Sequence, residues 1–488
     1  MGLPPRVRSA SLAAGHVVGE GIDKTVCRHH RRRLRRVGWG HALESGDAGW
    51  VTATASEPRE GNRVEILIDG ANVLPRMAED IAAAESDVNL SGWHFSAELD
   101  LTRGEHPTIL RNLLAELAGR AQVRVLTWKG SPVPVFRPTR GDVSSMLGRL
   151  GKSNQIECVS DTCVRQWHCH HEKTIVIDDR IAYVGGIDLT LDGGDPFDTS
   201  EHRARGRVGW HDAAVRLEGP IVADVANHFR MRWHGATDER LPEPPPSSGS
   251  GSVTLQRLRT VPEGIFQRSL PKGDFSILAS YMGALRSARK LIYLENQFLW
   301  SPEIVGVLAD KLRDPPADDF RIVVLLPAQA NDGADVSRGQ VAALIHADDG
   351  AGRFLAATIF ARSGTIRDTI YVHSKIGIVD DRWLTIGSAN LNEHSLFNDS
   401  EVNVLTLDEE LARETRLRLW SEHLELPVDR VDGDSTHVIE KLWKPIADEQ
   451  LERIRAGAPI EHRLVKLPGV SRRHRRAIGS VKGRVFDG

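Results

Sequence analysis

The sequence has few cysteines and no long apolar run. Four of its 488 residues are cysteine, which is too few for a disulfide framework in a chain of this length and favours a reducing compartment. No run of eighteen apolar residues is present, so we expect any membrane contact to be peripheral. Residues 1–20 hold only a weakly apolar stretch broken by His and Gly, which makes a poor secretory signal. The expected location is the cytoplasm or the membrane periphery, with export by another route left open.

The sequence also lacks an excess of charge of one sign. It carries 63 basic and 66 acidic residues, a formal net charge of −3, so bulk charge does not predict binding to polyanions. Two local basic segments remain, RHHRRRLRR at residues 28–36 and RRHRR at residues 472–476. Each is interpreted either as a solvated basic tail or as a segment attracted to anionic lipid or nucleic acid.

A Pro-, Gly- and Ser-rich stretch, LPEPPPSSGSGS at residues 241–252, divides the chain near its middle. On either side, apolar β-branched runs alternate with helical patterns, which is typical of α/β units. We predict a basic and poorly ordered leader with a short helix, a first half, a linker, a second half, and a C-terminal helix with a basic tail. Their predicted bounds are residues 1–62, 63–240, 241–255, 256–430 and 431–488.

The two halves repeat the same order of elements. Phe95 closes a predicted strand 76 residues before His171, and Phe298 closes a similar strand 75 residues before His373. Each half then ends in a strand followed by a helix. Self-similarity at a fixed spacing indicates a duplicated unit.

The most specific pattern is a histidine, a lysine and an aspartate at the same offsets in both halves. Residues 171–186 read HEKTIVIDDRIAYVGG and residues 373–388 read HSKIGIVDDRWLTIGS, with Lys two positions and Asp seven positions after His. Because alternate residues of a strand share a face, each imidazole lies beside an ammonium, which is a site for a phosphate. The small residues at Gly186 and Ser388 let backbone N–H groups approach an anion, and Ser388 and Asn390 add side-chain donors. We therefore predict phosphate binding at these three residues.

The doubled HxKxxxxD pattern resembles the phospholipase D superfamily. Further strings are similar to segments of that family, namely GWHDAAVRLEGPIVADVANHFRMRW at residues 209–233, YLENQFLW at residues 293–300 and NEHSLFNDSE at residues 392–401. The resemblance covers roughly residues 63–425 and is closest to phospholipase D proper. It implies an α/β fold of two duplicated α/β/α sandwich halves, related by a pseudo-twofold axis, with the active site at their interface.

The resemblance also implies a mechanism with two histidines. His171 would attack phosphorus and form a phosphohistidine, and His373 would protonate the departing alcohol and then activate water or another alcohol. Lys173, Lys375 and Asn390 would hold the charge on the phosphoryl oxygens. No metal and no cofactor is expected.

Carboxylates complete the implied site. By match to the family, Asp212 is the histidine-orienting residue of the first half and Glu401 that of the second half. Asp178 and Asp380, the last members of the two motifs, are grouped with the catalytic residues and expected to fix the strand and the lysine. The first half has GGID where the second has GSAN, so no phosphate contact carries over to Asp188.

Other interpretations compete with this one. A zinc site at Cys163, His168, Cys169 and His170 is disfavoured because their spacing does not match a closed four-ligand set. The expected substrate is a phospholipid at a membrane surface, such as phosphatidylcholine, cleaved to phosphatidic acid and its head group, with transphosphatidylation as a further outcome. A cardiolipin synthase and a nuclease of the same superfamily are the alternatives. Nucleic acid is the less expected partner, and no obligate protein partner is inferred.

Overall fold

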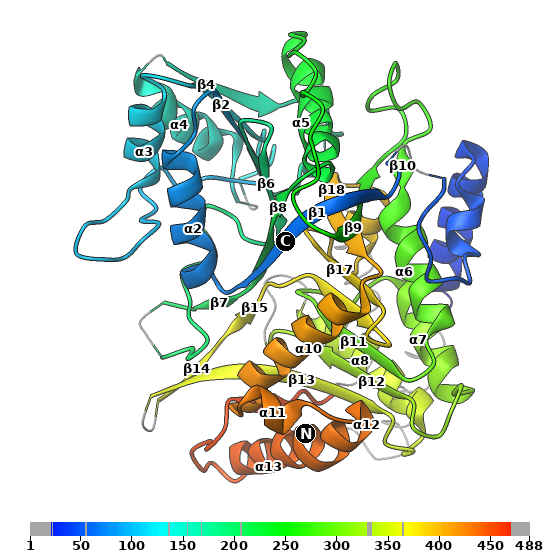
Figure 1. Cartoon of the computed structure of the whole chain (residues 1–488). Helices are drawn as coiled ribbons and strands as arrows, with labels where there is room; N and C mark the ends of the chain where they lie inside the picture. Colours follow the sequence, from blue (N-terminus) through cyan, green and yellow to red (C-terminus); the bar gives the residue numbers. More distant parts are fainter. Residues whose placement is uncertain are drawn as a thin grey trace.

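The computed structural model describes residues 21, 23–53, 56–134, 137–153, 155–166, 168–204, 207–328, 334–363 and 366–469. Strands and helices alternate in two successive rounds, which Figure 1 shows in sequence colours. Within the described residues, no helix is long and apolar enough to span a membrane. The predicted basic segment at residues 472–476 lies outside the described residues.

The first half contains eight strands and four helices among its described residues. The strands are β1 (Arg59–Ile68), β2 (Asp87–Gly92), β3 (Gln122–Trp128), β4 (Ile156–Asp161), β5 (Thr174–Ile177), β6 (Ile181–Gly185), β7 (Trp210–His211) and β8 (Ala213–Glu218). The helices are α2 (Gly70–Ala82), α3 (Leu110–Leu117), α4 (Arg140–Leu150) and α5 (Ile221–Thr237). The main sheet has the order β4-β3-β2-β5-β6-β8-β1, parallel from β4 to β2 and antiparallel from β2 to β1.

The second half repeats this arrangement. Its strands are β9 (Val253–Val261), β10 (Asp274–Phe275), β11 (Leu291–Glu295), β12 (Arg321–Leu325), β13 (Phe354–Ser363), β14 (Ile366–Thr369), β15 (Tyr371–Val372), β16 (Ile376–Val379), β17 (Trp383–Gly387), β18 (Glu401–Thr406) and β19 (Leu464–Lys466). The order β13-β12-β11-β16-β17-β18-β9 has the same parallel and antiparallel pairings as the first sheet. The predicted duplication and the α/β fold class are confirmed.

The helices of the second half alternate with its strands as in the first half, and further helices follow in the C-terminal region. They are α6 (Ser276–Ser287), α7 (Pro302–Arg313), α8 (Ala334–Asp348), α9 (Glu393–Phe397), α10 (Glu409–Leu424), α11 (Val428–Val431), α12 (Ser435–Val438), the π-helical turn η3 (Ile439–Trp443) and α13 (Lys444–Arg455). Short 3₁₀ turns are η1 (Gly40–Leu43) and η2 (Gly151–Ser153). Local sequence explains several starts: Ser301 and Asp408 each accept a backbone N–H from the first turn of α7 and α10.

The period-two pattern of the strands distributes their side chains between separate cores. In β5, Ile175 and Ile177 pack with α2, α3 and α4 on the outer face of the first sheet, whereas Val176 belongs to a central core. That central core contains residues of both sheets together with α5 and α10. The outer face of the second sheet packs on α6, α7 and α8. Each sheet is therefore covered on both faces, as a sheet with buried strands requires.

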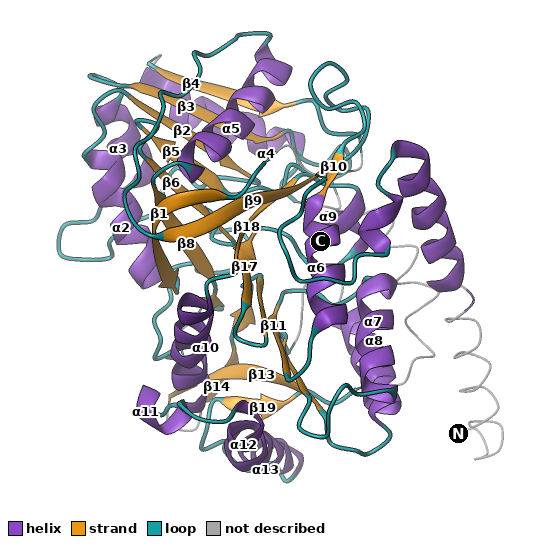
Figure 2. Cartoon of the chain, turned by 45° about the vertical axis from the view of Figure 1, so that its right-hand side comes forward, coloured by secondary structure: helices purple, strands orange, loops and turns teal. Residues whose placement is uncertain are grey.

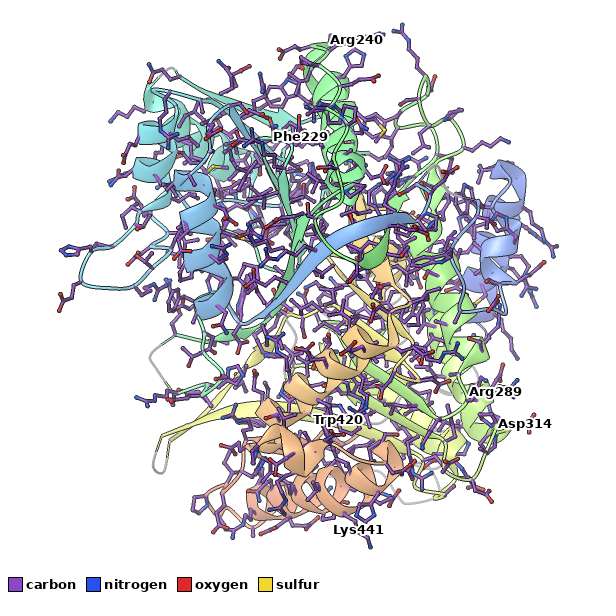
Figure 3. All side chains as sticks on the ribbon, in the orientation of Figure 1. Phe229, Arg240, Arg289, Asp314, Trp420 and Lys441 are labelled. Atoms are coloured by element: carbon purple, nitrogen blue, oxygen red, sulfur yellow. The ribbon has the colours of Figure 1, made fainter. Side chains whose placement is uncertain are left out.

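Figure 2 shows the two sheets as one run of strands between these helices. The sheets join where β1 pairs with β9, through Arg59 opposite Leu255 and Asn62 opposite Val253. In Figure 3, Phe229 of α5 and Trp420 of α10 lie within the ribbon outline, and both side chains are buried. The labelled charged residues Arg240, Arg289, Asp314 and Lys441 lie near the rim and are exposed.

The predicted poor order of the leader is wrong for its described part, whereas the predicted short helix is present. Residues 23–37 form a helix, and Leu34, Trp39 and Leu43 are buried in the core with α6. Arg33 forms an ion pair with Glu263 at 2.7 Å. The apolar positions are sparse among arginines, so the pattern looked polar although one face of the helix is buried.

Two other boundaries differ from the prediction. The linker ends earlier than expected because β9 begins at Val253, where it pairs with β1. The C-terminal helix is present as α12, η3 and α13, but the chain then returns to add β19 to β13, with Lys466 opposite Ala357. A three-residue strand is too short for its alternation to be recognised in a sequence.

Candidate active site

The two motif histidines lie just before equivalent strands, β5 and β16, and each is anchored to the opposite half. The backbone N–H of His171 donates to the carbonyl of Ser400 at 3.0 Å, and that of His373 donates to the carbonyl of His211 at 2.8 Å. Both histidine side chains are buried. Burial holds the pKa of His373 well below its usual value, and the charges of Lys375, Lys173 and His171 lower it further.

Each histidine is paired with a carboxylate of the other half. His171 Nδ1 lies 2.9 Å from Glu401 Oε1, and His373 Nδ1 lies 2.6 Å from Asp212 Oδ2. The prediction that each half supplies its own orienting carboxylate is therefore wrong. The reason is that Ser400 and His211, which bind the histidine backbones, immediately precede Glu401 and Asp212 in the chain. Two consecutive residues of the opposite half thus contact each histidine: the first through its backbone carbonyl and the second through its side-chain carboxylate.

Burial controls the protonation of these pairs. It raises the pKa of Glu401 to about 8 and that of Asp212 to about 6, against the opposing effects of Lys173 and Lys375. Burial and the same two lysines hold the pKa of both histidines well below the usual value. At neutral pH the imidazoles are uncharged, and where the paired carboxylate is ionised the single proton at Nδ1 leaves Nε2 with a free lone pair. A bound anionic phosphate would offset the lysine charges and favour an imidazolium.

The two motif lysines have different partners. Lys173 Nζ donates to the carbonyl of His171 at 2.8 Å and pairs with Asp188 at 3.1 Å. Lys375 Nζ donates to the carbonyl of its own motif histidine and to Gln297 Oε1 at 3.1 Å. Burial lowers the pKa of Lys375 to about 7.

Gln297 is a site residue that the sequence prediction missed. Asn390 Nδ2 donates to its Oε1 at 3.2 Å, and its own Nε2 donates to the Tyr371 hydroxyl at 2.8 Å. Gln297 therefore links Lys375 and Asn390. The sequence signal for Gln297 was its place in the string ENQF, which is similar to a segment of the family but has no assigned role.

The structure gives Gly186 and Ser388 another role than phosphate binding. Their backbone N–H groups donate to the carbonyls of Ala213 and Val402, both at 3.0 Å, so neither is available to an anion. A Cβ on Gly186 would overlap the Asp212 carboxylate. The Ser388 hydroxyl donates to Glu401 at 2.5 Å. These two predictions are wrong because both residues serve the carboxylates that hold the histidines.

Asp178 and Asp380 lie at the far ends of their strands. Asp178 accepts hydrogen bonds from the backbone N–H groups of residues 85–87, and Asp380 from those of residues 289–291. Each lies seven positions after its motif histidine, a span of about 20 Å in an extended chain. As expected, they fix the strand, because they tie the hairpin turn to the start of β2 or β11. Their grouping with the residues that contact the phosphate is wrong.

Aromatic rings surround His373. Trp210 stacks on its imidazole with ring centroids 4.4 Å apart, and Tyr371 stacks at 5.9 Å. Both belong to the short parallel pair of β7 and β15, which joins the two halves. A two-residue strand pair offered no pattern from which this stacking could be predicted.

The cysteines and histidines of the disfavoured zinc interpretation do not converge. His170 Nδ1 contacts Asp161 at 2.8 Å, whereas His168 lies 3.5 Å from Asp399. Cys169 uses its backbone N–H to bind Asp399, and Cys163 binds Asp161 in the same way. The segment instead buttresses the backbone around His171.

Comparison with known proteins finds phospholipase D-like sequences. Residues 281–421 match a family described as "Cardiolipin synthase, PLD-like domain". The chain is 26% identical to phospholipase D A of Dictyostelium discoideum, over 77% of this chain and 37% of that protein. It is 24% identical to phospholipase D2 of Bos taurus, over 72% of this chain and 50% of that protein. The chain thus spans about a third to a half of the length of these relatives.

The fold is similar to that of a solved enzyme. The crystal structure of phosphatidylserine synthase from Haemophilus influenzae superposes with a TM-score of 0.53, at 13% identity, over 80% of this chain and 93% of that chain. At this identity the likeness concerns the arrangement of strands and helices. It supports the α/β fold with two sheet halves described above.

Proposed function

This chain belongs to the phospholipase D superfamily, and we propose that it is a phospholipase D. Its substrate is a glycerophospholipid such as phosphatidylcholine, presented at a membrane surface. It hydrolyses the distal phosphodiester bond and yields phosphatidic acid and the head-group alcohol. The observation that carries the proposal is the pair of reciprocal contacts, His171 with Glu401 and His373 with Asp212.

The first step forms a covalent intermediate. Nε2 of His171 attacks phosphorus, a P–N bond forms, and the P–O bond to the head group breaks. With the phosphate bound, His373 is the imidazolium, and the departing oxygen takes a proton from its Nε2. Glu401 and Asp212 hold the two rings through Nδ1, so that each Nε2 faces the phosphate.

The second step releases the product. Nε2 of His373, now unprotonated, takes a proton from water, and the resulting hydroxide forms the new P–O bond as the P–N bond to His171 breaks. Replacing water by an alcohol yields a phosphatidyl alcohol by the same route. Both steps leave His171 and His373 in their starting protonation states.

Fixed positive charge and hydrogen-bond donors stabilise the phosphoryl oxygens. Lys173 and Lys375 approach the histidines from both halves, and each lowers the pKa of both imidazoles. Asn390 contacts the same Gln297 oxygen as Lys375, and its side-chain amide is a further hydrogen-bond donor for the phosphate. Such preorganised charge in a buried site favours the transition state.

A transferase is the second candidate. The description of the matching family names cardiolipin synthase, and the similar solved structure is named phosphatidylserine synthase. In such an enzyme a lipid or alcohol hydroxyl replaces water in the second step. A hydrolase and a transferase of this kind share the first step, the formation of the phosphohistidine. They differ in the acceptor of the second step.

The test is incubation of the purified chain with vesicles of single phospholipids, with and without ethanol. Phosphatidylcholine is expected to yield choline and phosphatidic acid, and ethanol is expected to divert product to phosphatidylethanol. The matched control is the His373→Ala variant, which should form no choline, no phosphatidic acid and no phosphatidylethanol. Cardiolipin formed from phosphatidylglycerol in preference to phosphatidic acid would favour the transferase, and cleavage of single-stranded DNA without lipid turnover would overturn the proposal.

A further inference from the structure

A second group of buried histidines and carboxylates includes His211, whose carbonyl accepts the backbone N–H of His373. Asp69, His202, His211 and Glu422 each direct a side-chain nitrogen or oxygen to one point, and these atoms all lie within 4.8 Å of one another. Three of the four side chains are buried, and that of Glu422 is 8% exposed. None of the four carries out a step of the reaction proposed above.

Three of the distances within the group are close to the edges of a metal tetrahedron. His211 Nδ1 lies 2.9 Å from Asp69 Oδ1 and 3.2 Å from Glu422 Oε1, and His202 Nε2 lies 3.1 Å from the same Glu422 oxygen. Metal–ligand bonds of about 2.0–2.1 Å would set tetrahedral ligands about 3.3 Å apart. Two imidazole nitrogens and two carboxylate oxygens are a ligand set of zinc and its neighbours in the first transition series.

The outer nitrogens of both histidines are held as metal ligands require. His202 Nδ1 lies 3.1 Å from Asp198, and His211 Nε2 lies 3.0 Å from Glu295. A ligating imidazole almost always donates its other N–H to a carboxylate or a carbonyl, which fixes the tautomer and leaves a lone pair for the metal. In this group the lone pairs would belong to His202 Nε2 and His211 Nδ1, the two nitrogens that face the other members.

Hydrogen bonds alone leave this group unsatisfied. Asp69 Oδ2 is buried and accepts no hydrogen bond, and its ion-pair partner, His202 Nε2, is 3.9 Å away. One ring nitrogen, His211 Nδ1, would have to serve two carboxylates at once. A buried carboxylate oxygen without a partner is energetically costly, and a cation at the centre would remove that cost.

We propose that Asp69, His202, His211 and Glu422 bind a divalent transition-metal ion, of the zinc class, that joins the two halves. Asp69, His202 and His211 belong to the first half, and Glu422 lies on α10 of the second. The ion holds the strand that carries His211, whose carbonyl binds the backbone N–H groups of His373 at 2.8 Å and Ser374 at 3.1 Å. Its role is to position His373, and it takes no part in bond making or breaking.

The experiment measures metal bound to the full-length chain, purified without a polyhistidine tag and dialysed. Elemental analysis is expected to find about one zinc-class ion per chain. Glu422→Gln and His202→Gln should each lower the content to near background. The matched control is His228→Gln, because His228 is also buried against a carboxylate, Glu172 at 2.8 Å, outside the proposed site. It should retain the ion.

A second measurement covers the case in which a variant fails to fold. Chelation of the wild-type chain should lower its unfolding temperature by several degrees, and added Zn²⁺ should restore it. Co²⁺ loaded into the wild-type chain should give the absorption bands of tetrahedral coordination. A wild-type chain that takes up neither Zn²⁺ nor Co²⁺, or unchanged metal content in Glu422→Gln, would overturn the proposal. These readouts do not depend on lipid turnover, so they are independent of the proposed function.

Discussion

The two halves of the molecule have the same scaffold and unequal sites. Their sheets have the same strand order, and their histidines are anchored by equivalent crossings of the chain. The surroundings differ. Lys173 pairs with the carboxylate of Asp188, whereas Lys375 binds the amide of Gln297, and Trp210 stacks on His373. The motif residues thus hold equivalent positions in surroundings that differ, as the two roles proposed for the histidines require.

The crossed carboxylates show why neither half is expected to act alone. Glu401 holds a histidine of the first half and is itself bound by Ser388 and Ser395, both hydroxyls at 2.5 Å. Asp212 holds a histidine of the second half and accepts only one further backbone N–H of those described, from Ala213 at 2.8 Å. A change in one half therefore acts on the histidine of the other.

The largest expected effect follows from removing either histidine. His171→Ala and His373→Ala should each lower turnover of phosphatidylcholine by at least about 10⁴-fold, because each removes a group with its own indispensable step. The measurement is choline release at saturating lipid. Near-normal turnover in either variant would contradict the mechanism with two histidines.

A substrate with an activated leaving group should separate the two roles. p-Nitrophenol needs no protonation to depart, so His373→Ala should release a single burst of it from phosphatidyl-p-nitrophenol and accumulate the phosphohistidine. His171→Ala should show no burst. If the burst appeared only in His171→Ala, the roles of the two halves would be reversed.

Neutral substitutions of the two carboxylates come next in size. Glu401→Gln and Asp212→Asn should each lower turnover of phosphatidylcholine by about 10²- to 10⁴-fold, because an amide at Nδ1 favours the wrong tautomer. With phosphatidyl-p-nitrophenol, Glu401→Gln should slow the burst, since it misorients His171. Asp212→Asn should leave the burst and slow the following steady state. The opposite assignment would mean that the carboxylates act within their own halves in solution.

The sequence predicted the scaffold well because its signals are local. Strand alternation, the repeated spacing of His171 and His373, and the motif itself need no knowledge of long-range contacts. The crossing of the carboxylates could not be predicted in this way, because 230 residues separate His171 from Glu401. Gln297 lacked any pattern of its own.

Errors in the predicted site have a common physical cause. A glycine such as Gly186 admits an approaching anion and an approaching carboxylate equally well, and the structure has the carboxylate of Asp212 there. A motif aspartate marks a repeated position without revealing whether it binds substrate or backbone. Asp178 binds the backbone of residues 85–87.

The two motif aspartates should be equal in effect, in contrast to the histidines. Asp178→Asn and Asp380→Asn each weaken a set of three backbone hydrogen bonds, and Asn tolerates the positive φ of 52° and 53° at these turns. We expect a loss of about 1–3 kcal/mol in the free energy of unfolding. Thermal unfolding measures this loss, with the exposed Asp310→Asn as control. A turnover per folded molecule that fell a hundredfold would return these aspartates to the catalytic group.

The smallest expected effect concerns the unequal lysines. Burial lowers the pKa of Lys375 to about 7, and the negative charge of Asp188 opposes that lowering. Only the protonated lysine can hold the phosphoryl charge, so kcat/KM should fall as the pH rises through this range. Asp188→Asn removes the opposing charge, lowers the pKa of Lys375 further, and should move the fall to lower pH by a fraction of a unit. Asp192→Asn removes a half-exposed carboxylate on the same loop and should leave the profile unchanged. A shift to higher pH in Asp188→Asn, or an equal shift in both variants, would show that the alkaline limb belongs to a group other than Lys375.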